Sequence, residues 1–189
     1  EHTRDHDALA SMSAMTTSDG RVFYIYDEGP VSVIHQPADW KLIARDAFNG
    51  KLLWKRDIPD WMTHLYNFRA GPVWLTRRLV SIDKEVFVTL GFEAPVQKLD
   101  AGTGKTLMTY KGSDETEELI VHDGMVLTVK GDPELMIGQS DECVGFWEKS
   151  EELEATVGKQ IIAYDAKSGK QKCKLDMPEL EGLVPLSLC

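Results

Sequence analysis

Apolar and β-branched residues of this chain gather in short runs bounded by Asp and Gly. Three such runs follow an aspartate and a turn residue, in SDGRVFYIY (18–26), IDKEVFVTL (82–90) and HDGMVLTV (122–129). Runs of this length that start after Asp-Gly or its equivalent are typical of strands entered through tight turns. The pattern therefore predicts three copies of a strand that follows a tight turn.

A second repeated pattern follows each of these stretches. Its core is Asp-Ala-x-x-Gly-Lys, found in LIARDAFNGKLLWK (42–55), VQKLDAGTGKTLMTY (96–110) and IIAYDAKSGKQKCK (161–174). An Asp side chain can accept a hydrogen bond from the backbone two residues on, and Gly supplies the positive φ that ends such a turn. Because all three copies carry them, we interpret the following residues as structural: Asp46, Gly50, Asp100, Gly104, Asp165 and Gly169.

A strand is also expected before each Asp-Gly turn, which gives every repeat four strands in meander order. These first strands are predicted in MSAMTTS (12–18), RRLVSI (77–82) and EELIVH (117–122). A repeated four-stranded antiparallel unit is typical of a β-propeller blade. We therefore predict an all-β chain that forms a partial propeller over 1–189. Its parts are blade one (about 11–57), blade two (about 77–111), blade three (about 117–176) and the first strand of a further blade (about 182–189).

The repeat resembles that of quinoprotein, or PQQ-like, β-propellers, whose consensus is roughly Ala-x-Asp-x-x-x-Gly-x-x-x-Trp. The matching residues are Ala44, Asp46, Gly50 and Trp54 in the first copy, and Ala163, Asp165 and Gly169 in the third. Met108 and Cys173 take the Trp position in the other copies. We expect side chains at this position to pack between blades, where a large or soft apolar group can fill the gap.

The resemblance implies several kinds of function. Members of this family are eight-bladed alcohol and sugar dehydrogenases, or non-enzymatic relatives such as the BamB-type lipoprotein of outer-membrane assembly. Similar repeats also form sensor-like domains attached to bacterial kinases. The adjacent Cys-Cys pair that family dehydrogenases place against the quinone is missing from this sequence, and no catalytic Asp with Ca²⁺ partners is evident. We therefore expect no cofactor, and PQQ with Ca²⁺ only if the chain is part of a dehydrogenase.

Three blades do not close a ring of seven or eight. The chain is therefore expected to be a segment of a larger bacterial protein, or alternatively to complete a ring by oligomerising. Open blade edges would also allow self-association, because an unpaired strand edge is adhesive unless something covers it. The family resemblance implies a periplasmic or cell-envelope location.

The repeats differ in length at one place. Only 17 residues separate Asp83 from Asp100, whereas 42 separate Asp123 from Asp165. In a four-stranded meander, the second-to-third connection and the connection to the next blade share one edge of the sheet. The long segments 27–40, 56–74 and 131–160 are therefore predicted on a single face of the propeller.

Loops on a rigid scaffold commonly carry binding residues, so this face is the candidate site for a protein partner or a small ligand. The candidate ligand-binding residues are His35, Trp61, His64, Tyr66, Arg69 and Trp147. The alternative is that the insertions only cap the rim, with 147–158 as a short surface helix whose acidic run is a solvated face.

Aligned first strands place Arg77 and Arg78 at the positions of Glu117 and Glu118 in the next blade. Because first strands of neighbouring blades face each other around the central channel, we predict an Arg–Glu ion pair between blades. Partial burial would make this pair stronger than one on the surface. The alternative is that these side chains point into their own sheets.

Composition excludes several classes of partner. The formal charge of −10, without clustered Lys and Arg, argues against nucleic acid. No apolar run is long enough to span a bilayer. Three cysteines allow one disulfide at most, and the pairing of Cys143 stays open. His35 and His64 have no partner at metal-ligand spacing, and no catalytic triad order or phosphate-binding loop is present.

These observations favour a non-enzymatic propeller that acts as an interaction or ligand-binding scaffold. The alternatives are part of a PQQ-dependent alcohol or sugar dehydrogenase, in which other blades supply the Ca²⁺ site and the base, or a sensor domain attached to a kinase-like protein.

Overall fold

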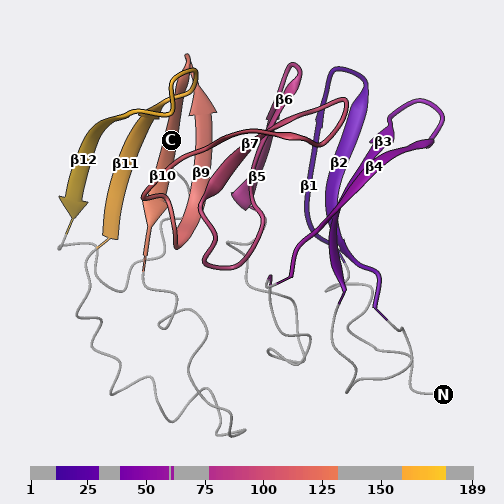
Figure 1. The fold of residues 1–189 in the computed structure, drawn as a ribbon, viewed down its shortest axis with the longest axis horizontal. Coiled ribbons are helices and arrows are strands. Elements are labelled where there is room, and N and C mark those ends of the chain that lie inside the picture. The colour runs from indigo at the N-terminus through magenta and orange to yellow at the C-terminus, as the bar shows by residue number, and fades with distance from the viewer. Residues whose placement is uncertain (1–11, 30–38, 60, 62–76, 132–158, 178–189) are drawn as a thin grey trace, which may run out of the picture.

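The computed structural model describes residues 12–29, 39–59, 61, 77–131 and 159–177 of the 189-residue chain. These residues form three four-stranded antiparallel sheets in sequential strand order, which stand side by side (Figure 1). Blade one contains β1 (Met12–Ser18), β2 (Arg21–Asp27), β3 (Trp40–Asp46) and β4 (Leu52–Asp57). Blade two contains β5 (Leu79–Ile82), β6 (Glu85–Thr89), β7 (Val96–Asp100) and β8 (Thr106–Thr109). Blade three contains β9 (Thr116–His122), β10 (Met125–Lys130), β11 (Lys159–Asp165) and β12 (Gln171–Met177). The predicted all-β meander is confirmed.

First strands are neighbours in space, as they are around the axis of a propeller. Strand β5 contacts both β1 and β9, and the hydroxyl groups of Thr16 and Ser81 lie 3.1 Å apart. The predicted helix at 147–158 and the predicted strand at 182–189 lie outside the described residues. Within the part of the chain that the structure describes, we find no helix with the length and apolarity to cross a membrane.

Two-residue turns join the first and second strands of each blade. The aspartates that open these turns, Asp19, Asp83 and Asp123, have φ values of 47°, 51° and 46°. Asp tolerates this left-handed region better than most residues, and such turns match the twist of the paired strands. The turns therefore fix the register of each hairpin, so that Ser18 lies opposite Arg21 and His122 opposite Met125.

Turns between the third and fourth strands follow the predicted chemistry. In blade one, Oδ1 of Asp46 accepts hydrogen bonds from the backbone NH groups of Phe48 and Asn49, at 2.9 and 3.0 Å. The NH of Gly50, at φ 72°, donates to the carbonyl of Asp46. Asp100 and Asp165 accept equivalent bonds in the other blades, at Oδ1 from Thr103 and from Ser168.

Two hydrophobic cores lie between the blades. Alternate residues of β6 serve different cores: Val86 and Val88 join the core with blade one, and Phe87 joins the core with blade three. Both faces of blade two are thus buried, which explains why its second strand is apolar at successive positions.

Residues at the Trp position of the repeat pack on the next blade. The ring of Trp54 lies over Gly104, where a Cβ atom would be only 2.7 Å from two ring carbons, and its Nε1–H donates to the carbonyl of Ala101 at 2.9 Å. Met108 occupies the same place over Gly169, with its sulfur 2.7 Å from a Cβ at that position. The glycines therefore serve both the turn and the contact between blades.

Candidate functional site

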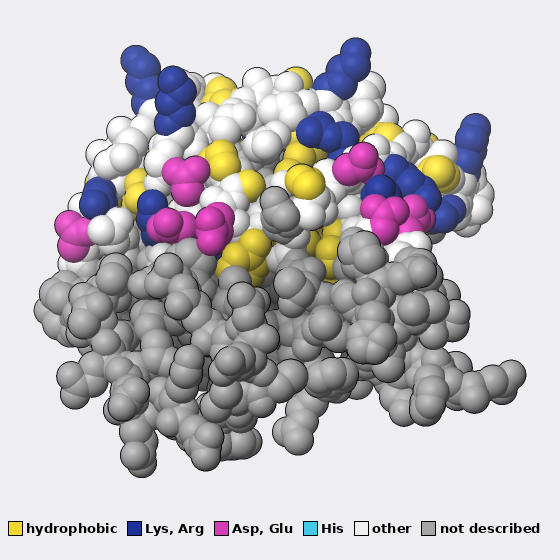
Figure 2. Space-filling view, turned by 60° about the horizontal axis from the view of Figure 1, so that its bottom comes forward, with side chains coloured by type: hydrophobic (Ala, Val, Ile, Leu, Met, Phe, Trp, Pro, Cys, Tyr) yellow, Lys and Arg dark blue, Asp and Glu magenta, His cyan; other side chains and the backbone are white. Residues whose placement is uncertain are grey.

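The described strand ends that border the long connections lie at one edge of the three sheets. At this loop-rich edge β2 ends at Asp27, β3 begins at Trp40, β10 ends at Lys130 and β11 begins at Lys159. The hairpin turns lie at the opposite, tight-turn edge (Figure 1). Figure 2 shows basic side chains projecting from the margin away from the grey residues, and acidic side chains near the boundary with them.

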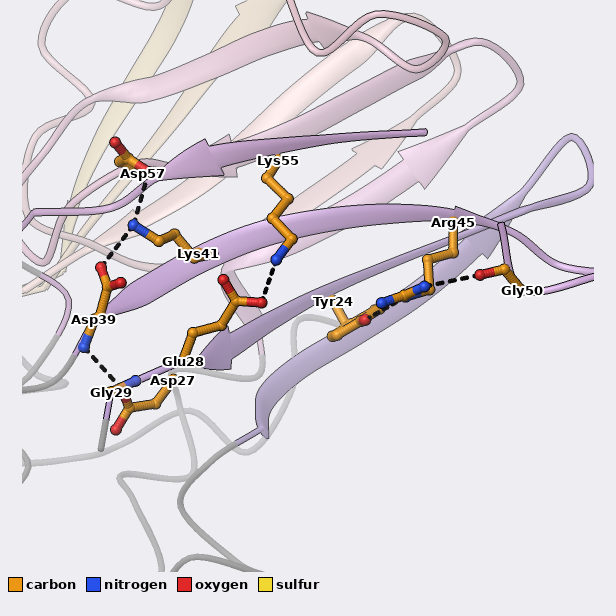
Figure 3. A network of polar contacts seen from close by, with 10 residues as sticks. All are labelled: Tyr24, Asp27, Glu28, Gly29, Asp39, Lys41, Arg45, Gly50, Lys55 and Asp57. Carbon is orange, nitrogen blue, oxygen red and sulfur yellow. Dashed lines mark hydrogen bonds and ion pairs between the residues drawn. The ribbon is translucent and has the colours of Figure 1, made fainter. Parts of the chain in front are cut away.

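The stem of the first long connection is closed by a buried carboxylate. Oδ1 of Asp27 accepts hydrogen bonds from the NH groups of Gly29 and Asp39, both at 2.8 Å (Figure 3). The NH of Glu28 donates to the carbonyl of Asp39 at 2.9 Å. These bonds hold the two ends of the connection together where it leaves the sheet.

Two lysines form ion pairs at the same stem. Nζ of Lys41 lies 2.6 Å from a carboxylate oxygen of Asp39 and 2.9 Å from one of Asp57. These two hydrogen-bonded carboxylates raise the pKa of Lys41 to about 12. A further ion pair joins Lys55 to Glu28 (Figure 3). Both lysines of this stem are thus paired with carboxylates of blade one.

Arg77 and Glu118 form an ion pair between blades two and three, with Nη1 3.4 Å from Oε2. The Glu118 side chain is buried and that of Arg77 is partly exposed. This is the contact that the alignment of first strands predicts. It joins the two blades at the start of β5 and β9, on the loop-rich edge.

Arg78 is more deeply buried, at 1% exposure. Its Nη1–H donates to the carbonyl of Phe92 at 2.5 Å, and its guanidinium carbon lies 4.8 Å from the centre of the Phe92 ring. Burial lowers the pKa of Arg78 from 12.5 to about 10, and the charge of Glu117 opposes this change. The side chain is therefore still charged at neutral pH, and it anchors the short connection of blade two to the start of β5.

Glu117 lies against the backbone at the end of β10. A Cβ atom at Gly131 would be 1.6 Å from its Oε1, so only glycine leaves room for this carboxylate, which is 3% exposed. The NH of Gly131 donates to the carbonyl of Glu115, and Nζ of Lys130 lies 3.3 Å from the Glu115 carboxylate. The departure point of the longest connection is thus fixed to the first strand of its own blade.

Blade two closes this edge with short connections. The hydroxyl of Ser113 accepts a hydrogen bond from the NH of Val96 and donates to the carbonyl of Tyr110, and the Thr116 hydroxyl donates to the carbonyl of Ser113. All these groups are buried. Buried hydrogen bonds thus hold the described connections of blade two against the end of its sheet.

Of the candidate ligand-binding residues, only Trp61 is described. It is 1% exposed within the core between blades one and two, and its Nε1–H donates to the Ser13 hydroxyl at 2.8 Å. This placement corrects the expected role: the ring packs in the core and offers no surface to a ligand. The other candidates, His35, His64, Tyr66, Arg69 and Trp147, lie outside the described residues.

Sequence reasoning missed three residues that shape this edge: Asp27, Phe92 and Gly131. Asp27 ends a strand, and its carboxylate could have been predicted to accept hydrogen bonds from the backbone of the following connection. Neither the contact of Phe92 with Arg78 nor that of Gly131 with Glu117 has a signal in the local sequence.

The described residues do not offer a metal centre. Among them, no three His, Cys, Asp or Glu side chains come together as a cation site would require. The buried carboxylates of this edge already accept bonds from protein groups, as Asp27 and Glu118 do.

Comparisons with known proteins support the fold. No family model and no curated protein sequence matches this chain. Among solved structures, a europium-containing methanol dehydrogenase superposes with a TM-score of 0.52 at 14% identity, over 89% of this chain and 26% of the other. A quinohemoprotein alcohol dehydrogenase from Comamonas testosteroni gives 0.50 at 18% identity, over 89% and 22%.

An acylaminoacyl peptidase from Pyrococcus horikoshii gives a TM-score of 0.54 at 11% identity, over 93% of this chain and 26% of the other. The chain thus spans about a quarter of each of these proteins. Such low identities show the fold alone. The resemblance to quinoprotein propellers is confirmed at that level: this chain has the fold of a β-propeller segment similar to those of quinoprotein dehydrogenases.

Proposed function

We propose that this chain is a propeller segment that binds a protein partner or a small ligand at its loop-rich edge and catalyses no reaction. The observation that carries the proposal is the bracing of the two stems. Asp27 ties together the ends of the connection in blade one, and Glu115 and Glu117 hold the end of β10 in blade three. A rigid base that presents long connections is the usual arrangement of a binding surface.

Charges on the described part of this edge also support a scaffold rather than a reaction centre. The carboxylates of Glu28, Asp39 and Glu118 are paired with protein cations, and no metal-binding cluster is present among the described residues. The family resemblance favours a location outside the cytoplasm, in the cell envelope, which cell fractionation would test.

Affinity capture would test the binding role. The immobilised chain would be compared with a loop variant, His64→Ala with Arg69→Ala, and with a control, Lys51→Glu with Lys105→Glu, altered at the tight-turn edge. We expect one set of retained proteins or ligands that the loop variant loses and the control keeps. Equal retention by all three chains, or loss by the control alone, would contradict the proposal.

A dehydrogenase segment is the second candidate, because the solved structures similar to this chain include dehydrogenases. Adding PQQ and Ca²⁺ with an alcohol or a sugar and a redox dye discriminates between the two. Dye reduction that depends on both PQQ and substrate would overturn the scaffold proposal. A role as a sensor domain of a kinase-like protein would be recognised from a catalytic domain joined to this segment.

A further inference from the structure

The tight-turn edge carries a lysine at the same place in every blade. These residues are Lys51, Lys105 and Lys170, and all three are exposed. The backbone carbonyl of each accepts a hydrogen bond from the NH of the aspartate that opens its turn, at 2.9 Å in all three blades. The same bond thus fixes each lysine where the fourth strand begins. Figure 2 shows basic side chains projecting outward from this margin.

Cations exceed carboxylates in the turns between the third and fourth strands, here called the outer turns (45–51, 99–105 and 164–170). These segments contain five Lys and Arg residues and three Asp residues, although the whole chain has a formal charge of −10. The turns between the first and second strands have no such excess. The outer turns are therefore the part of this edge that attracts an anionic partner.

Internal contacts engage the three aspartates but not the lysines. Oδ1 of each aspartate accepts hydrogen bonds from NH groups of its own turn, at 2.7 to 3.1 Å. Nζ of Lys172 also lies 3.0 Å from the Asp165 carboxylate. Exposed lysines of the outer turns that form no ion pair among the described residues are Lys51, Lys105, Lys167 and Lys170. Their charges remain available to a partner.

An aromatic ring projects from the same edge. Phe48, at the tip of the outer turn of blade one, is 90% exposed. Its NH is bound by Asp46 at 2.9 Å, and its ring edge would lie 3.1 Å from a Cβ atom at Gly20. The ring is thus held beside the neighbouring hairpin while most of its surface faces water. Transfer of such a ring to an apolar environment is favourable.

Hydrogen bonds tie each outer turn to the first hairpin of its own blade. The NH that follows the turn aspartate donates to a carbonyl of that hairpin, at 2.8 to 2.9 Å. The donor and acceptor pairs are Ala47 and Gly20, Ala101 and Lys84, and Ala166 and Gly124. An edge that is already ordered in this way loses little conformational freedom when it docks.

A bilayer surface fits the charge and the ring together. Its anionic headgroups attract lysine side chains, and an exposed Phe is favoured at the boundary between headgroups and acyl chains. The hairpin turns of the three blades all end at one edge, as a broad flat partner requires (Figure 1). The net charge of −10 opposes the approach, but charges beyond about 8 Å are largely screened at physiological ionic strength. The lysines nearest the bilayer therefore dominate.

We propose that the tight-turn edge is a contact surface for an anionic phospholipid bilayer. Lys51, Lys105 and Lys170 lie against headgroup phosphates, and the ring of Phe48 enters the boundary with the acyl chains. The loop-rich edge then faces away from the bilayer. This contact uses the edge opposite the proposed partner site, so either one can fail without the other.

Vesicle sedimentation with the full chain tests the charge contribution. Vesicles of equimolar phosphatidylglycerol and phosphatidylcholine are compared with vesicles of phosphatidylcholine alone. We expect binding to the anionic vesicles only, weakened by added NaCl. Lys105→Glu should lower this binding about tenfold or more. Lys111→Glu, at an exposed lysine about 20 Å further along the same blade, should leave it nearly unchanged.

An alanine pair tests the contribution of the ring. Phe48→Ala should lower binding to the anionic vesicles about fivefold, because the apolar contact is lost. Leu175→Ala removes another exposed apolar side chain, 54% exposed on β12, and should leave binding nearly unchanged. Unfolding temperatures of the variants show whether each still folds.

A fluorescent probe gives a second measurement that does not depend on the lysine variants. Phe48→Cys, in a chain whose native cysteines are replaced by serine, carries an environment-sensitive dye. Its emission should shift to shorter wavelength when anionic vesicles are added. The same dye on Asp57→Cys, at the loop-rich edge, should show no shift. Equal shifts at both positions would contradict the proposed orientation.

Three further outcomes would overturn the proposal. One is equal binding to anionic and neutral vesicles, or to neither. Another is equal loss of binding for Lys105→Glu and Lys111→Glu. The third is retention on immobilised polyglutamate without any binding to vesicles, which would assign the edge to an acidic polypeptide instead.

Discussion

The two interfaces between blades place chemically different side chains over the turn glycine of the next blade. Between blades one and two, a single residue, Trp54, both covers Gly104 and donates to the carbonyl of Ala101. Between blades two and three these tasks are divided. Met108 covers Gly169, while Lys98 and Tyr110 supply the hydrogen bonds to the carbonyl of Ala166.

The difference teaches that the constant part of the repeat is its backbone. The turn glycine and the carbonyl after the turn aspartate occur at the same place in both receiving blades. The side chain that reaches the carbonyl can come from the third strand, as Lys98 does, or from the fourth, as Trp54 does. A search for the consensus Trp alone therefore underestimates how many copies make the contact.

Removing the side chain that covers the turn glycine should have the largest effect on the free energy of unfolding. The size of this effect should differ between the two interfaces. Trp54→Ala should lower the free energy of unfolding by about 3–5 kcal/mol, because it leaves a large cavity and an unpaired carbonyl. Met108→Ala should cost about 2–3 kcal/mol, since the hydrogen bonds to Ala166 remain. Denaturant unfolding measures both, and a larger loss for Met108→Ala would refute the comparison.

Replacing the turn glycines by alanine should have the next largest effects on the free energy of unfolding. Alanine at Gly50, Gly104 or Gly169 costs about 1–2 kcal/mol for the left-handed backbone alone. Gly104→Ala should add up to about 3 kcal/mol, because the rigid Trp54 ring lies 2.7 Å from the new Cβ. The flexible Met108 can move away, so Gly169→Ala should fall between Gly104→Ala and Gly50→Ala, and thermal unfolding would show any other order.

Removing the two donors that share the carbonyl of Ala166 should have a smaller effect on the free energy of unfolding, and the two substitutions should be coupled. Lys98→Met or Tyr110→Phe alone should cost about 1 kcal/mol, because the other donor still satisfies the carbonyl. The double variant should lose more than the sum, since a buried carbonyl is then unpaired. A double-mutant cycle by urea unfolding measures this coupling, and simple additivity would show that the two donors act independently.

The smallest expected effect concerns acid stability at the turns. Hydrogen bonds from the Ser168 backbone, and then from Lys172, lower the pKa of the partly exposed Asp165 below its ordinary 3.8, and Thr103 lowers that of Asp100. Carboxyls with lowered pKa values stabilise the fold above about pH 4, and this stabilisation is lost as the pH falls below it. The unfolding temperature of the wild type should therefore drop more steeply from pH 5 to pH 3 than that of Asp165→Asn, and parallel curves would exclude this contribution.

Local chemistry made most of the fold predictable. Asp46 and Gly50 have side-chain and backbone requirements that hold within a few residues, so their turn could be read from the sequence, and the copies then located the blades. Trp54 could be assigned to a contact between blades because its spacing from Gly50 recurs.

The candidate site was less predictable, because its contacts join residues far apart in sequence. Arg78 meets Phe92 and Glu117 meets Gly131 only through the arrangement of the blades. Lys98 lies in a strand that would ordinarily direct a charge to solvent, yet its amine reaches the neighbouring blade. Trp61 belongs to an irregular segment without periodicity, so nothing in the sequence signalled that its ring enters the core.

The hydrogen bonds that close the stem of the connection in blade one bear on which changes of length and sequence that connection can tolerate. Because Asp27 and the Glu28–Asp39 bond close the ends of a connection, the sheet registers do not depend on what lies between them. By the closure entropy of an ideal loop, closing the connection 131–158 of blade three instead of 90–95 of blade two costs only roughly 1.4 kcal/mol more. Segments of different length and composition can therefore be exchanged at this edge, by evolution or by grafting, while the blades keep their side-by-side packing.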